Sequence, residues 1–235
     1  MNISILIPTR LRSERLQPLI NNIYETAHNK EGIEVLFFIE SDDQPTIDAV
    51  KSAALHNERI RYIIKDSRGE GLLYSDLHNT LYTESRGSII LVGADDIKFH
   101  TPNWDDMVNE CFDQYEDKIL LVNPRDGIQN GNIAPHFFVH RNWVDILGYV
   151  TPTWFLSWFQ DTWVTTMARN IGRYIYLPDF YLEHLHHTVG KRPRDKTSAD
   201  KDRGIGRDRQ IWGERQAELA VDTEKLRTFI TTFPK

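Results

Sequence analysis

The chain has 235 residues and a formal net charge of −6 at pH 7, and 40% of its residues are apolar. This length predicts one large domain, and the composition excludes wholesale disorder. No apolar run approaches about 18 residues, so we expect no membrane span. The lone cysteine, Cys111, excludes an intrachain disulfide framework and a multi-cysteine zinc site. Residues 1–8 lack the basic region and cleavage site of a signal peptide, so we expect a cytoplasmic protein.

The N-terminal part of the chain alternates short apolar runs with segments of helical spacing. The apolar runs predict strands at residues 3–7, 35–39, 61–64 and 88–92. Helical spacing predicts helices over residues 13–28 and 45–55, and a third that ends near residue 84. This alternation indicates βαβ units, and non-alternating apolar runs fit strands covered by helices on both faces. The sequence therefore predicts an α/β fold with a mixed, mostly parallel Rossmann-type sheet flanked by helices.

The C-terminal part of the chain is less regular. It predicts strands at residues 119–122, 136–140 and 173–177, and helices over 143–147, 160–170 and 214–229. Residues 190–215 contain nine Lys and Arg and five Asp and Glu, which gives this segment a local charge of +4. Three interpretations of the segment stay open: a basic flap that closes over phosphates, a solvated loop, or a patch that faces nucleic acid.

Three polar segments follow predicted strands, at residues 8–10, at residues 40–43 and at Asp95-Asp96. Ligands bind beyond the carboxyl ends of strands in such sheets, so we expect these segments on one rim. Paired carboxylates repel each other unless a cation compensates, and hard oxygen ligands suit Mg²⁺ or Mn²⁺. The alternative for Asp95-Asp96 is a turn that caps backbone amides. Residues 40–43 either contact a ribose or base, or cap the helix that follows them.

Two further groups carry possible chemistry. In an extended segment His184 and His186 share a face, where neutral imidazoles can complete the coordination of a cation. The alternative is a partly exposed histidine cluster. Asp161 follows an aromatic stretch at residues 154–160, which suits a general base beside a sugar or a base. The alternative there is a tryptophan core with Asp161 as a first-turn acid of the next helix.

Several enzyme classes are excluded by missing motifs. The loop at residues 68–71 is too short and wrongly spaced for a P-loop, and the chain contains no GxGxxG and no nucleophile elbow. ATPase, Rossmann dehydrogenase and α/β-hydrolase functions are therefore not expected.

Taken in order, residues 1–190 resemble a GT-A-fold glycosyltransferase of the family 2 type. The resemblance rests on residues 3–10 as the opening strand and nucleotide loop, on residues 35–43 as the second strand, and on residues 89–97 as the strand with the metal-binding Asp-x-Asp motif. Gln160-Asp161 lies where the family has its catalytic acid, and residues 184–187 lie where a late histidine meets the metal.

The chain departs from the family pattern in two ways. Gly93 replaces the usual first aspartate of Asp-x-Asp, and the Gln-x-x-Arg-Trp signature of processive members is absent, so we do not expect a polymer synthase. The His-x-His followed by Gly190-Lys191 also resembles small glycosyltransferase-like proteins encoded by phages, which would act in the host cytoplasm.

The resemblance implies a metal-dependent inverting glycosyltransferase that moves a sugar from a nucleotide-sugar to an acceptor hydroxyl. It implies Mn²⁺ or Mg²⁺ at Asp95, Asp96, His184 and His186, and Asp161 as the catalytic base. The residues expected to hold the nucleotide, with a UDP-sugar as donor, are Pro8, Thr9, Arg10, Glu40, Asp42, Asp43, Asp95, Lys191 and Arg192. The expected acceptor is a glycan or DNA with hydroxymethylated bases.

The resemblance also implies a division of residues 1–235 within one domain. Residues 1–100 form the nucleotide-binding half, 101–190 the acceptor-binding and catalytic half, and 191–235 a basic flexible loop with a C-terminal helix. Two other functions stay open. A nucleotidyltransferase would open with a glycine-rich phosphate loop, which residues 8–15 lack. A catalytically degenerate GT-A-like protein would bind nucleotide or glycan without turnover.

Overall fold

A computed structural model of the chain describes residues 2–67, 69 and 73–234, so most of the loop at residues 68–71 lies outside the described residues. Within them, eight strands form one mixed sheet in the order β3-β2-β1-β4-β7-β6-β8-β5. The strands are β1 (Ile3–Thr9), β2 (Ile33–Glu40), β3 (Ile60–Lys65), β4 (Ile89–Val92), β5 (Ile97–Phe99), β6 (Leu121–Arg125), β7 (Phe137–His140) and β8 (Tyr174–His184). Strands β1 to β4 are parallel, β7 runs antiparallel to β4 and β6, and β5 runs antiparallel to β8.

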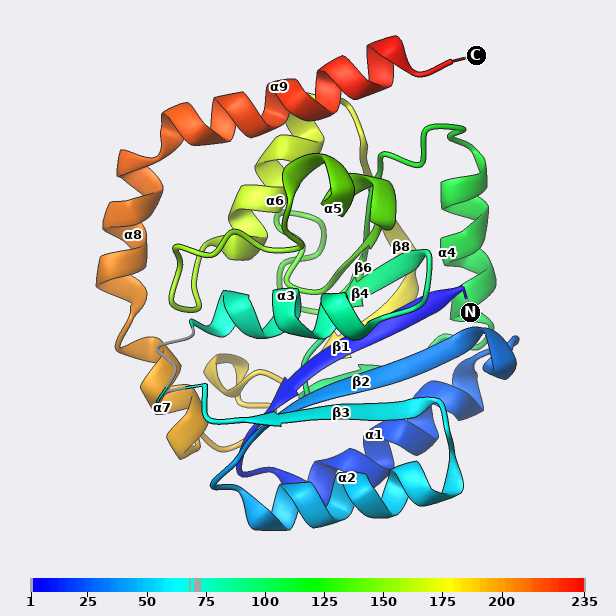
Figure 1. Cartoon of the computed structure of the whole chain (residues 1–235), viewed down its shortest axis with the longest axis vertical. Helices are drawn as coiled ribbons and strands as arrows, with labels where there is room; N and C mark the ends of the chain where they lie inside the picture. Colours follow the sequence, from blue (N-terminus) through cyan, green and yellow to red (C-terminus); the bar gives the residue numbers. More distant parts are fainter. Residues whose placement is uncertain (1, 68, 70–72, 235) are drawn as a thin grey trace.

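Helices cover both faces of the sheet (Figure 1). They are α1 (Ser13–Thr26), α2 (Gln44–His56), α3 (Tyr74–Glu84), α4 (Trp104–Asp113), α5 (Arg141–Leu147), α6 (Gln160–Asn170), α7 (Lys196–Asp202), α8 (Ile205–Glu214) and α9 (Gln216–Thr232). One apolar core lies between the sheet and α1, α2 and α4, and the other lies between the sheet and α3, α5, α6 and α9.

The central strands belong to both cores because successive side chains of a strand point to opposite faces. Ile5 and Ile7 of β1 pack in the first core, whereas Leu6 packs in the second. All seven residues of β1 and all eight of β2 are buried. Non-alternating apolar runs therefore predicted these strands correctly, and the mixed sheet flanked by helices is confirmed.

Several elements differ from the sequence-based expectation. Strand β8 extends to His184, well beyond the predicted residues 173–177. Strand β5 and helix α4 were not predicted. Strand β5 has only three residues and therefore gives no periodic signal. Residues 191–235 were expected to be a basic flexible loop followed by a C-terminal helix, but the part before that helix contains α7 and α8. Asp195 caps α7 by accepting a hydrogen bond from the Ser198 amide at 2.8 Å.

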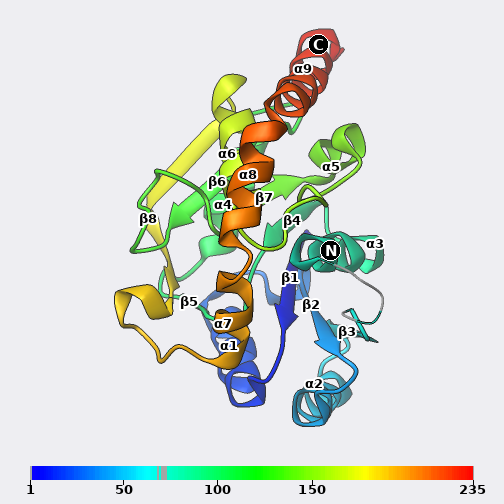
Figure 2. The ribbon, with the colours of Figure 1, turned by 90° about the vertical axis from the view of Figure 1, so that its left-hand side faces the viewer.

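The C-terminal helices follow one another along one side of the molecule, as Figure 2 shows for α7, α8 and α9. Asp208 of α8 is fully buried and connects these C-terminal helices to the loop before α6. Its carboxylate accepts hydrogen bonds from the amides of Leu156, Ser157 and Trp158 at 2.8, 2.9 and 2.9 Å. The C-terminal segment is thus attached to the aromatic loop at residues 154–159. No helix in the described part of the chain has both the length and the apolar character that crossing a membrane requires.

Candidate functional site

Two adjoining pockets lie at the carboxyl ends of β1 and β4. The Glu40 pocket is lined by residues that include Pro8, Thr9, Arg10, Glu40, Ser67, Leu77 and Asp95. The central pocket is lined by residues that include Gly93, Asp96, His136, Trp158, Asp161, His184 and Arg192. Arg12, Tyr74, Ser157 and Lys201 line both pockets. The two pockets are therefore adjoining parts of one cleft, and two of the four shared residues, Arg12 and Lys201, are cationic.

Asp95 belongs to the Glu40 pocket. Its carboxylate accepts a hydrogen bond from the Thr9 hydroxyl at 2.8 Å and forms a buried ion pair with Arg12. Burial raises the pKa of Asp95, while the Arg12 guanidinium opposes that shift. Thr9 and Arg12 thus occupy the Asp95 carboxylate in the Glu40 pocket, and the expected role of Asp95 as a metal ligand stays a prediction.

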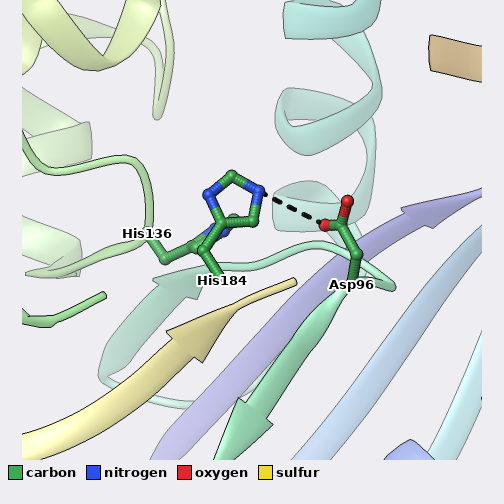
Figure 3. Close-up of side chains that lie close together, drawn as sticks. All are labelled: Asp96, His136 and His184. Atoms are coloured by element: carbon green, nitrogen blue, oxygen red, sulfur yellow. Dashed lines mark ion pairs between the residues drawn. The ribbon is translucent and has the colours of Figure 1, made fainter. Parts of the chain in front are cut away.

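Asp96 turns instead into the central pocket, where strand pairing brings two histidines to it. Ile97 of β5 pairs with His184 of β8, so Asp96 lies beside the end of β8. Val92 of β4 pairs with Phe137 of β7, which brings His136 to the same place. Asp96, His136 and His184 each offer a ligand atom within 4.8 Å of the others. Figure 3 shows the three side chains gathered there, with the His184 ring directed at Asp96.

The donor atoms of these three residues suit a divalent cation. His184 Nε2 lies 3.6 Å from Asp96 Oδ1, too far for a hydrogen bond. With ligand bonds of about 2.1 Å, two ligands of one ion lie roughly 3.0–3.6 Å apart. Both ring nitrogens of buried His136 lack a hydrogen bond of normal geometry, although the Val92 carbonyl is near enough to favour the protonated ring. A buried imidazole with ring nitrogens left this way is able to bind a metal ion.

The protonation states of the three residues agree with metal binding. Burial lowers the pKa of His136 and of His184, so both imidazoles are neutral at pH 7 and keep a lone pair. Burial opposes ionisation of Asp96, but His184 when it is protonated, together with the cations Lys201 and Arg12, outweighs burial and lowers the pKa of that carboxyl group. The group thus presents two neutral imidazoles and one carboxylate.

Cations surround the junction between the two pockets. The Arg192 guanidinium donates to Asp96 Oδ2 from Nη2 at 2.9 Å and from Nε at 3.2 Å. Lys201 Nζ lies 3.6 Å from the centroid of the Tyr74 ring, and Lys201 forms no ion pair with any described residue. Arg12, Arg192 and Lys201 can therefore neutralise an anion that spans the two pockets.

Asp161 faces the central pocket from the first turn of α6. Phe159, just before the helix, has a φ of 68°, so the chain turns sharply there and places Asp161 at the start of α6. The Asp161 carboxylate accepts a hydrogen bond from the Thr162 amide at 2.7 Å and forms no ion pair within the described ranges. Burial raises the pKa of Asp161. Asp161 also lines a neighbouring cavity with Ile128 and Gln129, which we call the Ile128 pocket.

Three of the other expected site residues have local roles, and a fourth, Asp42, lies outside both pockets. Asp43 accepts hydrogen bonds from the amides of Leu11 and Thr46 and caps α2, as the alternative interpretation proposed. Asp42 is exposed and lines neither the Glu40 pocket nor the central pocket. Lys191 pairs with Glu183 at 2.9 Å, outside both pockets. His186 lines the central pocket, but its Nδ1 contacts the Thr188 hydroxyl at 2.8 Å and it is not part of the three-residue metal group.

Three residues of the site were missed by the sequence analysis: Arg12, His136 and Lys201. The helical cap Arg12 is 4% exposed and pairs with both Asp95 and Asp195, whereas Arg10 had been expected to bind the nucleotide. His136 lies one residue before β7, and the histidine four residues later, His140, is at the other end of that strand, so the H-x-x-x-H spacing does not indicate the group that His136 joins. Lys201 was one of nine cations in its segment. Local patterns gave no signal for any of the three.

Comparison with known proteins identifies the fold. No protein-family model and no curated protein matches the chain. The mannosyltransferase PcManGT from Pyrobaculum calidifontis, in complex with GDP-Man and Mn²⁺, matches with a TM-score of 0.61 at 16% identity, over 81% of this chain and 58% of that one. S. aureus TarS 1-349 matches with a TM-score of 0.62 at 14% identity, over 78% and 60%. Its complex with UDP-GlcNAc matches with a TM-score of 0.59 at 14% identity, over 86% and 64%.

These three structures are similar to this chain in fold. The chain spans 58% to 64% of their lengths. Its own fold is therefore of the GT-A type, as the resemblance in residues 1–190 implied.

Proposed function

We propose that the chain is a metal-dependent glycosyltransferase that moves a sugar from a nucleotide-sugar to an acceptor hydroxyl with inversion. One observation carries this proposal: a single cleft combines an elongated binding site, a three-residue metal group and a partly buried carboxylate, Asp161. The fold that it shares with PcManGT and TarS supports the same class of reaction.

The nucleoside of the donor fits the Glu40 pocket. Thr9 and Glu40 line it with a hydroxyl and a carboxylate, groups that hydrogen-bond to ribose hydroxyls and base N–H groups. The diphosphate then lies at the junction, where Lys201 and Arg12 line both pockets. Arg192, which is paired with Asp96, supplies further charge-assisted hydrogen bonds to phosphate oxygens.

Asp96, His136 and His184 would hold the divalent cation. A cation bound there stabilises the negative charge of the leaving nucleoside diphosphate. Two imidazoles and one carboxylate favour Mn²⁺ over Mg²⁺, because imidazole suits transition metals better than the harder magnesium ion.

Asp161 would act as the general base. It lies in the wall between the central pocket and the Ile128 pocket, so a hydroxyl group entering from the second pocket can reach it. The carboxylate takes the hydroxyl proton as the hydroxyl oxygen bonds to the anomeric carbon. The bond from that carbon to the diphosphate oxygen breaks in the same step, and its electron pair leaves with the diphosphate. A single displacement inverts the anomeric configuration.

The absence of an aspartate at position 93 does not by itself indicate a degenerate protein. A Cβ atom at Gly93 would lie 3.3 Å from the Leu6 carbonyl oxygen, closer than ordinary contacts. His136 supplies a ligand from β7 instead, so the site keeps three protein ligands. A nucleotidyltransferase fits less well, because Asp161 has no evident role in attack on a nucleoside triphosphate.

The test is calorimetric titration of UDP, GDP, CDP and ADP, each with and without Mn²⁺. We expect one nucleotide, UDP by our prediction, to bind in a metal-dependent manner. Product analysis with the corresponding nucleotide-sugar then checks for release of the nucleoside diphosphate. Binding of none of the four would refute the proposal and leave the degenerate glycan-binding protein as the better explanation.

A further inference from the structure

The Ile128 pocket has a chemistry of its own. It meets the central pocket at Asp161, Trp158, Pro135, His184 and His186, which line both cavities. Beyond these shared residues, its walls carry apolar side chains and the neutral polar side chains of Gln129, Thr162 and Thr188. Under the proposed function, on which this inference rests, a molecule in this pocket is positioned to present a hydroxyl group to Asp161.

Among the described residues, no lysine or arginine lines the Ile128 pocket. The carboxylate of Asp126 is also present, and it accepts hydrogen bonds from the amides of Ile128, Gln129 and Asn130. A pocket with carboxylates and without cations repels a phosphate or carboxylate group. The lining therefore disfavours an anionic occupant.

The basic segment at residues 190–215 does not alter this conclusion, because most of its charge is neutralised within the chain. Lys191 pairs with Glu183, Arg192 with Asp96 and Arg194 with Asp202, at 2.9, 2.9 and 2.8 Å. Arg203, Arg207 and Arg215 also form ion pairs, with Asp200, Asp208 and Glu218. Six of the nine cations are thus in ion pairs, and Lys201 lies in the donor cleft. Only Lys196 and Arg209 are left exposed and without an ion pair to a described residue, so little of the local charge of +4 is free to bind a nucleic-acid backbone.

Trp158 gives the pocket an aromatic wall. Its indole Nε1 donates to the Lys201 carbonyl at 3.2 Å, which fixes the edge of the ring. Phe159 stacks on Trp212, whereas Trp158 contacts no other aromatic ring within residues 2–67, 69 and 73–234. An aromatic face of this kind packs against the C–H face of a sugar ring, while neighbouring amide and hydroxyl groups bind its hydroxyls.

We propose that the Ile128 pocket binds the acceptor, and that the acceptor is a neutral saccharide. One ring packs on Trp158, Gln129 hydrogen-bonds to its hydroxyls, and one hydroxyl group faces Asp161. In transfer, that hydroxyl gives its proton to Asp161 and its oxygen bonds to the anomeric carbon of the donor, and the nucleoside diphosphate departs with the electron pair of the broken bond.

The experiment is saturation-transfer NMR on the full chain. The probes are neutral methyl glycosides, methyl glucuronide as an acidic sugar, and duplex DNA that contains hydroxymethylated cytosine. We expect signals from at least one neutral glycoside and none from the glucuronide or the DNA. Trp158→Ala weakens glycoside binding by about tenfold, while Trp158→Phe, which keeps the aromatic face, restores most of it. Because Trp158 also lines the central pocket, nucleotide affinity is measured in both variants, and the inference requires that glycoside binding falls more than nucleotide binding.

Two results would overturn the inference. In the first, no neutral glycoside binds. In the second, the DNA or the glucuronide binds, and Trp158→Ala has no effect on the binding of neutral glycosides. Nucleotide titration of the same samples separates this failure from failure of the proposed function. A chain that binds a nucleotide with Mn²⁺ but takes DNA as its acceptor keeps the transferase function and loses the saccharide assignment.

Discussion

Asp95 and Asp96 are consecutive residues, yet their carboxylates belong to different pockets. Asp95 pairs with Arg12 in the Glu40 pocket, and Asp96 joins His136 and His184 in the central pocket. In the proposed function, Asp96 alone of this pair holds the metal, and Asp95 lies at the nucleotide end of the cleft. The predictions for His136 and Lys201 below depend on that division.

His136→Ala should weaken Mn²⁺ binding at least about tenfold, since even second-shell partners of metal ligands have effects of that size. Calorimetry with Mn²⁺ alone measures the change. Wild-type protein should bind Mn²⁺ more tightly than Mg²⁺. His186→Ala is the matched control, because His186 lies next to the group without belonging to it. Equal Mn²⁺ affinity in the His136→Ala and His186→Ala variants would exclude His136 as a ligand.

Asp161→Asn should lower transfer by orders of magnitude and leave nucleotide binding intact, because only the base is removed. In the wild type, the rate should fall as pH drops through the pKa of Asp161, which burial raises above its usual value of 3.8. Single-turnover rates between acidic and neutral pH measure this fall in rate. Near-wild-type turnover of Asp161→Asn would show that another group takes the proton.

Lys201→Met should weaken nucleoside diphosphate binding roughly 10- to 100-fold, the effect of losing one hydrogen bond to a charged group of about 1.5–3 kcal/mol. The nucleoside without phosphates should bind equally well to variant and wild type. Lys196→Met in the same helix is the control, because Lys196 is exposed and lines neither pocket. Similar losses in both variants would indicate a general charge effect.

Acid should destabilise the protein through His78. Its Nε2 lies 3.0 Å from the Gly93 carbonyl, and burial lowers its pKa from 6.5 to about 4. The unfolded chain binds a proton more readily, so stability falls as pH drops from 6.5 towards 4, by on the order of 3 kcal/mol for this residue. Urea unfolding at several pH values measures the slope, and His78→Gln should reduce it. His136 and His184 contribute in the same direction, so part of the slope remains.

Asp208→Asn should destabilise the aromatic loop, because an amide group cannot accept from all three backbone N–H groups that Asp208 binds. We expect the free energy of unfolding to fall by about 1–3 kcal/mol. The Tm should fall by roughly 2–4 °C per kcal/mol lost. Acceptor KM should rise more than nucleotide Kd, since the loop carries Trp158. Asp200→Asn, at a partly exposed ion pair with Arg203, serves as the comparison. An unchanged Tm would contradict a stabilising role for the three hydrogen bonds that Asp208 accepts.

Much of the fold was predictable because its signals are local. The buried strands β1 and β2 are continuous apolar runs, and helix α6 begins and ends at the predicted residues, Gln160 and Asn170. The helices of the basic segment, α7 and α8, could not be predicted from local patterns, because tertiary contacts hold them in place. The capping residue of α7, Asp195, also binds Arg12, from the other end of the chain.

The amino-acid sequence by itself determined the α/β fold, the rim at the strand ends, and Asp96, Asp161 and His184 as candidates, since each follows from periodicity or from residues close in the chain. Only the tertiary structure decided which side chains meet. His136 reaches Asp96 through the pairing of β7 with β4, and His184 through the pairing of β8 with β5. Strand order and register depend on contacts between distant segments, which apolar patterns do not encode.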